Sequence, residues 1–174
     1  SIEHARRRGA AVLAYLRAAG ITCDAHHLTA PEPKGVQAAR AITDALDRAG
    51  LLPEEIDYVN AHGTGTRDND AMESAAIRKV FCEDRLPAVS STKRATGHTF
   101  GAAAAIEAIV CIQAIRNNLA PINAGSVSPD PAIDLPIVRG QSLRMPIRAA
   151  VSTNFAFGGN NTALVFADAP EGSP

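Results

Sequence analysis

Apolar and polar positions alternate along the chain with periods that change from helical to strand-like, and these changes mark the expected elements. Residues 36–49 have helical spacing, and Gly50 follows as a helix stop. The apolar stripe of this predicted amphipathic helix consists of Val36, Ala39, Ile42, Leu46 and Ala49. Pro31, Pro33 and Gly35 precede it and indicate a loop. We therefore expect this helix to serve as scaffold.

The next pattern is a strand, a polar loop and a helix. Residues 56–61 form the expected strand, residues 62–66 (H-G-T-G-T) the loop, and residues 68–81 the helix. Asp70 and Glu73 have the spacing of a capping box in the first turn of this helix. His62 then lies in the loop that follows the strand.

The same arrangement recurs in residues 88–118. A short strand, 88–91, leads into a Gly/Thr-rich turn that contains Lys93 and His98, and helical spacing then continues to Asn118. In a parallel sheet, the loops after successive strands meet at one edge, so His62 and His98 are expected to face one cleft.

The helix after His98 is apolar on nearly every side, which predicts that it is buried. Glu107 is the one acidic residue in its body. A buried carboxylate is costly unless it is paired or protonated, and Lys93 is the obvious partner.

Both ends of the chain contribute further elements. Residues 148–155 and 161–167 alternate as two strands joined by 156–160, which predicts an antiparallel hairpin, whereas residues 121–146 are too irregular to assign. Residues 2–8 are expected to form a basic helix that ends at Gly9. Residues 10–19 are compatible with a helix or with a strand that continues through 21–27, and composition favours the helix.

Composition excludes several classes of protein. The chain has 174 residues, 46% of them apolar, a net charge of −1 and a pI near 6.5, so it can form a core and shows no sign of binding nucleic acid. We see no signal peptide and no unbroken apolar run near the roughly 18 residues of a membrane span. The chain starts without Met and is expected to be cut from a longer protein.

The cysteines are odd in number and scattered, which predicts reduced thiols in a cytoplasmic protein. Cys23, Cys82 and Cys111 lack metal-ligand spacing, and none lies at a strand-to-helix turn that would activate a nucleophile. His26 and His27 are adjacent, so on a strand they point to opposite faces and do not suit a shared metal. We expect no metal and no cofactor.

Three segments together resemble a known family. Residues 60–66 (N-A-H-G-T-G-T), 90–103 (S-S-T-K-R-A-T-G-H-T-F-G-A-A) and 154–161 (N-F-A-F-G-G-N-N) are similar, in order and spacing, to the C-terminal signatures of the β-ketoacyl-acyl-carrier-protein synthases. The resemblance implies the C-terminal half of a thiolase-like α/β fold. Each half of that fold is a mixed five-stranded sheet with helices on both faces, and two halves stack as α-β-α-β-α. It also implies a strand over residues 10–27, a domain over 1–167 and a disordered tail at 168–174.

The resemblance implies an acyltransferase that condenses malonyl-ACP with an acyl thioester, and it assigns roles to matching residues. His62 and His98 match the catalytic histidines, and Lys93 matches the lysine that fixes the second of them. The remaining matches are Glu107 as the ionic partner of Lys93, Asp70 and Glu73 as supports of the first His loop, Phe157 as oxyanion-hole N–H and gate, and Thr64, Thr66, Gly158 and Gly159 as phosphopantetheine contacts. The Gly pair is also open to a simpler interpretation as turn residues only.

One part of the family's machinery is missing. The nucleophilic Cys lies in the family's N-terminal half, which has no counterpart in this sequence, so we expect as partners that half, an acyl carrier protein and a second synthase subunit in a homodimer or heterodimer. A chain-length factor, which resembles the synthase but lacks the Cys, is the alternative. Retention of His62, Lys93 and His98 favours the enzyme. A thiolase is less favoured, because it carries a second Cys near the final hairpin.

Overall fold

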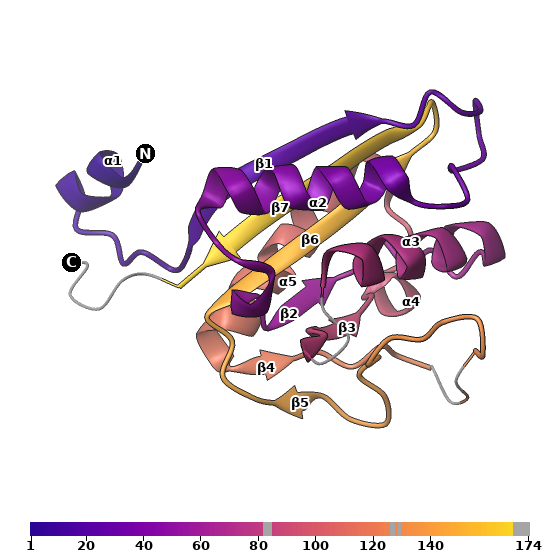
Figure 1. The fold of residues 1–174 in the computed structure, drawn as a ribbon. Helices are drawn as coiled ribbons and strands as arrows, with labels where there is room; N and C mark the ends of the chain where they lie inside the picture. Colours follow the sequence, from indigo (N-terminus) through magenta and orange to yellow (C-terminus); the bar gives the residue numbers. More distant parts are fainter. Residues whose placement is uncertain (82–84, 126–127, 129, 169–174) are drawn as a thin grey trace.

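A five-stranded mixed sheet lies at the centre of the computed structural model, which describes residues 1–81, 85–125, 128 and 130–168 (Figure 1). The strand order is β1-β7-β6-β2-β3. Its strands are β1 (Tyr15–Cys23), β2 (Tyr58–Asn60), β3 (Ala88–Ser90), β6 (Ala149–Ala156) and β7 (Asn160–Ala167). β2 pairs in parallel with β3 and β6, whereas β7 pairs antiparallel with β6 and β1. The predicted mixed sheet and C-terminal hairpin are confirmed.

Helices cover both faces of this sheet. The helices of the described residues are α1 (Ile2–Arg7), α2 (Val36–Ala49), α3 (Arg67–Val80), α4 (Lys93–Thr96) and α5 (Ala103–Asn117), with short 3-10 turns at Pro53–Glu55 and Phe100–Ala102. α2 and α3 pack on one face and α5 on the other, while α1 lies apart from the sheet (Figure 1). A small second sheet pairs β4 (Leu119–Ala120) with β5 (Leu143–Arg144). The predicted helices over 36–49 and 68–81 are confirmed, although Val36 is exposed rather than buried.

The core has two layers because neighbouring residues of a strand point to opposite faces. Val59 and Val151 pack with α2 and α3, whereas Tyr58 and Ala150 pack with Cys111 and Ile115 of α5. At these positions the central strands are therefore apolar on both faces, as expected for strands covered by helices on each side, whereas Asn60, Ser152 and Thr153 toward their carboxyl ends are buried polar residues.

The preference for a helix over residues 10–19, drawn from composition, is wrong. β1 pairs with β7 from Tyr15–Ala167 to Cys23–Asn160, so tertiary pairing overrides the helical propensity of the alanines. Gly20 allows α2 to lie directly against this strand, because a Cβ at that position would be 1.9 Å from the carbonyl oxygen of Ala41. The strand implied by the resemblance is confirmed, although it is shorter than 10–27.

The prediction that the helix after His98 is buried holds for one face of α5 in this chain. The buried residues of α5 are Ala103, Glu107, Cys111, Ala114 and Ile115, which form one face, whereas Ile109 on another side is 57% exposed. By length and composition alone, Phe100–Asn117 would also pass for a membrane span, with a mean hydropathy of 1.3. This is weak evidence, because core helices of globular proteins pass the same test and one face of α5 already packs on the sheet.

Candidate active site

Three loops leave the sheet at the same edge. Because β2 lies between β3 and β6 and pairs in parallel with both, the carboxyl ends of the three strands lie together. His62 follows β2, Lys93 and His98 follow β3, and Phe157 follows β6. The candidate residues from three distant segments of the sequence therefore gather where open α/β sheets place their sites.

The two imidazole rings meet at this edge. The ring centroids of His62 and His98 are 5.4 Å apart, and the rings are nearly perpendicular at 86°. His62 is buried, with Phe155 packed on its ring at a centroid distance of 5.6 Å, whereas His98 is exposed. The two histidines were expected to face one cleft; their rings are neighbours, and of the two only His98 lines the pocket described below.

The environment of His62 keeps its ring neutral. Burial, and then the positive charges of Lys93 and His98, lower the pKa of His62 to about 3, and a contact with Asn154 opposes this only in part. Its Nδ1 atom has no hydrogen-bond partner among the described residues. At neutral pH, His62 is therefore an uncharged imidazole with one N–H to donate.

A backbone contact determines which nitrogen of His98 carries a proton. The N–H of Phe100 donates to Nδ1 of His98 at 3.3 Å, so in the neutral ring the proton lies on Nε2. The ring of Phe100 also stacks on that of His98, with centroids 5.0 Å apart and planes 15° from parallel. Phe100 adopts a φ of 49°, a left-handed conformation that is strained for an aromatic residue.

Lys93 and Glu107 form a buried ion pair, as the sequence predicted. Lys93 is the first residue of α4 and Glu107 lies on the buried face of α5. Burial raises the pKa of the Glu107 carboxyl, and the ammonium of Lys93 opposes that shift. Oε1 takes the contact with Lys93, and Oε2 has no hydrogen-bond partner within the described part of the chain.

Acidic residues of α3 hold the His62 loop by its backbone. The two carboxylate oxygens of Glu73 accept the N–H groups of His62 and Gly63, each at 2.8 Å, and Asp70 accepts the N–H of Gly65 at 3.2 Å. The capping-box interpretation of Asp70 and Glu73 is wrong, because α3 begins after Thr66 and their side chains turn to this loop instead. Gly63 is needed here, since a Cβ would lie 2.5 Å from that of Ser91.

Thr153 belongs to the same network, although the sequence analysis did not single it out. Its hydroxyl lies 2.6 Å from Oε1 of Glu73 and 3.2 Å from the backbone nitrogen of His62. The only sequence signal was its position directly before the segment 154–161. Asn154, within that segment, raises the pKa of His62 and lowers the pKa of Glu107 through side-chain contacts, in each case against the larger effect of burial.

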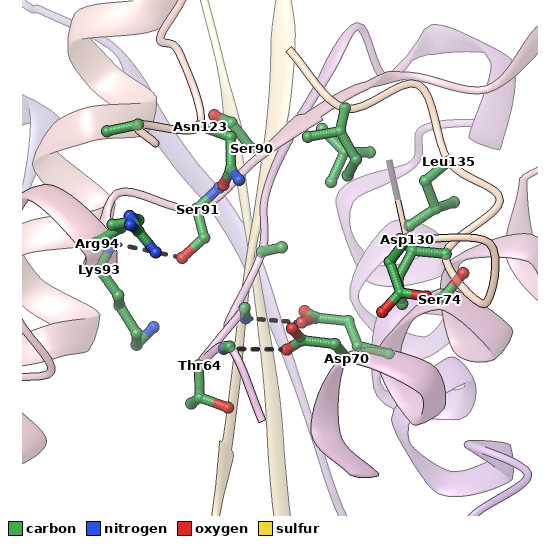
Figure 2. A pocket seen from close by; sticks show the side chains of 18 of the residues that line it. Thr64, Asp70, Ser74, Ser90, Ser91, Lys93, Arg94, Asn123, Asp130 and Leu135 are labelled. Carbon is green, nitrogen blue, oxygen red and sulfur yellow. Dashed lines mark hydrogen bonds between the residues drawn. The ribbon is translucent and has the colours of Figure 1, made fainter. Parts of the chain in front are cut away.

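An open pocket of about 470 Å³ lies beside the histidine loops. Figure 2 shows Thr64 and Asp70 on one side of it, Lys93 and Arg94 on another, and Asp130 from the connector after α5. His98 also lines this pocket. Thr64 is half-buried and lines this pocket, and its hydroxyl lies 2.9 Å from that of the exposed Thr66.

The tip of the β6–β7 hairpin is tied to the segment after β1. The N–H of Gly158 donates to the carbonyl of Leu28 at 2.7 Å, and the N–H of Asp24 donates to the carbonyl of Gly159 at 2.8 Å. Phe157 is 74% exposed. The aromatic ring that packs on His62 is Phe155 rather than Phe157.

The described thiols have no place in this site. Cys111 is buried in α5, and burial raises the pKa of its thiol, while Cys23 is exposed next to the hairpin tip. Cys82 and the predicted tail beyond Asp168 lie outside the described residues. Within the described ranges, no group of three or more His, Cys, Asp and Glu residues is arranged to hold a metal ion.

Comparisons with known proteins extend this picture. The family described as "Beta-ketoacyl synthase, C-terminal domain" matches residues 13–126. The mitochondrial 3-oxoacyl-[acyl-carrier-protein] synthase of Arabidopsis thaliana is 47% identical over 171 residues, which cover 95% of this chain and 37% of that protein.

Two solved structures are similar in fold as well as sequence. The ishigamide ketosynthase/chain length factor matches with a TM-score of 0.91 and 39% identity, covering 96% of this chain and 41% of that one. A type II polyketide synthase acyl-carrier protein in complex with its ketosynthase, bound to the hexaketide, matches with a TM-score of 0.90 and 34% identity, covering 97% and 42%. The chain therefore spans about two fifths of the length of the proteins it matches.

Proposed function

The chain belongs to the β-ketoacyl synthase family as its C-terminal domain, and on this premise we propose that it supplies the catalytic histidines for condensation of malonyl-ACP with an acyl thioester. The product is a 3-oxoacyl-ACP, made in fatty acid or polyketide synthesis. In this proposal the complete protein is a cytoplasmic acyltransferase. Its nucleophilic Cys lies in the N-terminal half.

The chemistry requires two hydrogen-bond donors at one oxygen. Cleavage of the malonyl carboxylate releases carbon dioxide and leaves the electron pair as an enolate on the thioester. The carbanion carbon then attacks the acyl thioester on the Cys, and the thiolate leaves. Donors aimed at the enolate oxygen in a site shielded from water stabilise this intermediate.

The proximity of His62 and His98 is the observation that carries the proposal. Their centroids are 5.4 Å apart, so two N–H groups can reach one oxygen atom. The lowered pKa of His62 favours a neutral ring that donates from one nitrogen, and the contact of Phe100 N–H with Nδ1 of His98 leaves Nε2 of that ring as its donor. Neutral donors stabilise the enolate without protonating it, which preserves the carbanion for condensation.

The surrounding residues have supporting roles in this proposal. Lys93, paired with Glu107, holds the turn that carries His98, and Asp70 and Glu73 hold the His62 loop. Thr64, which lines the pocket, and Thr66, whose hydroxyl lies 2.9 Å from that of Thr64, contact the phosphopantetheine arm of the carrier protein. Phe157 contributes an oxyanion N–H and gates the acyl chain, and Gly158 and Gly159 let the substrate approach the hairpin tip.

The partners follow from the same reasoning. The exposed side of α5, which carries Ile109, is expected to pack against the N-terminal half. The complete synthase is expected to pair as a homodimer or heterodimer. The solved relatives include a ketosynthase in complex with its acyl-carrier protein and a ketosynthase/chain length factor. Similarity to the latter keeps a chain-length factor, which lacks the Cys, as the alternative function for this chain.

The test is the complete protein supplied with an acyl thioester and malonyl-ACP. We expect carbon dioxide and 3-oxoacyl-ACP from the wild type and from His4→Ala, a control on the exposed helix α1, and neither product from the His62→Ala/His98→Ala double variant. A complete protein that forms no acyl-enzyme and no product, but stimulates a separate ketosynthase, would establish the chain-length-factor alternative.

A further inference from the structure

Thr153 lies at the centre of the contacts that hold His62. It is fully buried on β6, the strand next to β2. Its Oγ1 is 2.6 Å from Oε1 of Glu73, 3.2 Å from the backbone nitrogen of His62 and 3.4 Å from the carbonyl oxygen of Asn60. A single hydroxyl thus joins a residue of β6 to α3 and to the His62 loop.

The distances determine how this hydroxyl uses its proton. A hydroxyl donates one hydrogen bond, and the contact with the carboxylate is the shortest, so Thr153 donates to Glu73. Its lone pairs remain free to accept the N–H of His62, which also reaches Oε1 of Glu73 at 2.8 Å. Thr153, Glu73 and His62 therefore form a closed triangle of hydrogen bonds.

The triangle lies in a buried region, where each of its members depends on the others. Glu73 is 3% exposed, and burial raises the pKa of its carboxyl, while the Thr153 hydroxyl is foremost among the hydrogen bonds that favour the ionised form. Without that hydroxyl, the carboxylate would lose its shortest hydrogen bond, and the His62 N–H one of its two acceptors. Such losses are costly where water cannot replace them.

We propose that Thr153 is a positioning residue for His62, which fixes the loop after β2 so that the imidazole presents its N–H to the developing enolate. This inference rests on the function proposed above. Thr153 contacts the histidine through its backbone, so it acts through His62 rather than on substrate. The hydroxyl makes these contacts, so it is the group that the proposal requires. Substitutions can remove the hydroxyl or the methyl group of threonine separately.

The experiment compares Thr153→Val and Thr153→Ser in the complete protein. Val keeps the shape and lacks the hydroxyl, whereas Ser keeps the hydroxyl. We expect carbon dioxide release from malonyl-ACP to fall about tenfold or more in Thr153→Val, because small displacements of a catalytic group are costly. Transfer of the acyl group to the nucleophile should stay within about twofold of wild type, and Thr153→Ser should recover most of the decarboxylation.

Thr22→Val is the matched control. The Thr22 hydroxyl donates to the carbonyl of Gln37 at 2.6 Å and ties β1 to α2, away from the histidines. A purely structural role for Thr153 predicts that Thr153→Val and Thr22→Val lower both half-reactions alike, which would overturn the proposal. A second outcome would also reject the positioning role. If Thr153→Val and Thr153→Ala both fail to fold while Thr22→Val folds, the Thr153 hydroxyl is required for the fold itself.

The outcomes also separate this inference from the function on which it rests. If His62→Ala decarboxylates at the wild-type rate, the role of His62 is wrong and Thr153 has nothing to position. If His62→Ala is impaired but Thr153→Val is not, only the inference about Thr153 fails. Adding Thr153→Val to His62→Ala should cause no further loss of decarboxylation, because both changes remove the same contribution.

Discussion

The ammonium of Lys93, at the start of α4, forms an ion pair with the carboxylate of Glu107 on α5, and the two side chains are only 5% and 2% exposed. The pair joins the turn that carries His98 to the helix that follows it. A buried pair of this kind does not by itself imply net stabilisation, but breaking it strands a charge.

Removal of one partner should therefore cost more than removal of both. Lys93→Ala is expected to lower the free energy of unfolding by about 3–5 kcal/mol, because Glu107 would be left as an uncompensated buried carboxylate. The Lys93→Ala/Glu107→Gln variant should recover part of this stability but little activity, since His98 remains misplaced. A double-mutant cycle that measures unfolding and turnover on the complete enzyme checks this. Strictly additive stability losses would contradict the pairing.

The histidines should matter more for decarboxylation than for acyl transfer. His62→Ala and His98→Ala are each expected to slow carbon dioxide release by roughly 10²-fold or more, the usual scale for loss of a preorganised oxyanion donor. Formation of the acyl-enzyme should be affected less, because no malonyl enolate forms in that step. The measurement is carbon dioxide release beside radiolabelled acyl-enzyme formation. Parent rates of carbon dioxide release in both variants would refute the shared-donor role.

His62 should also make stability depend on pH. Its folded pKa is lowered from 6.5 to about 3, so between these values the unfolded chain binds a proton that the folded site excludes. Stability is therefore lost as the pH falls below about 6.5, with a slope of at most about 1.4 kcal/mol per pH unit.

The comparison with His62→Asn isolates this contribution. Glu73 and Glu107 are present in both proteins, so their raised carboxyl pKa values largely cancel in the difference. The free energies of unfolding of the two complete proteins are measured between pH 4.5 and 8. They should differ by a constant amount above about pH 7, and below it the free energy of unfolding of the wild type should fall relative to that of His62→Asn. A difference that is flat across the whole range would show that His62 is not buried in its neutral form.

Ile109 tests whether another surface covers the outer side of α5. It is 57% exposed in this chain, so a polar residue there should cost little unless the rest of the protein covers it. In the complete protein we expect Ile109→Asp to lower the melting temperature by several degrees, because a charge would be buried at the junction of the two halves. Val36→Asp, at an exposed position of α2 on the opposite face of the sheet, is the control. Equal melting temperatures for both variants would show that this side of α5 faces solvent.

The periodic segments of the sequence defined much of the fold. A helix was predicted for 36–49 and strands within 56–61 and 148–167, and the structure has these elements. The prediction succeeds there because local propensity and tertiary burial favour the same conformation. Residues 10–19 show the opposite case. Their alanines favour a helix, and only the pairing of β1 with β7 makes them a strand. The partner strand lies about 150 residues away in the sequence, so no local pattern encodes this contact.

The candidate site divides in the same way. The sequence by itself identified His62, His98, Lys93 and Glu107, because a repeated strand-loop-helix pattern and one acidic residue in an apolar helix are local signals. Only the tertiary structure decided that Thr153 joins Glu73 in holding the His62 backbone, that Phe155 packs on the His62 ring, and that α5 is buried on one side in this chain. The physical reason is that these contacts form between residues of β6, α3 and the loop after β2, which are far apart in the sequence. Their geometry exists only once the parallel strands have brought those segments to one edge of the sheet.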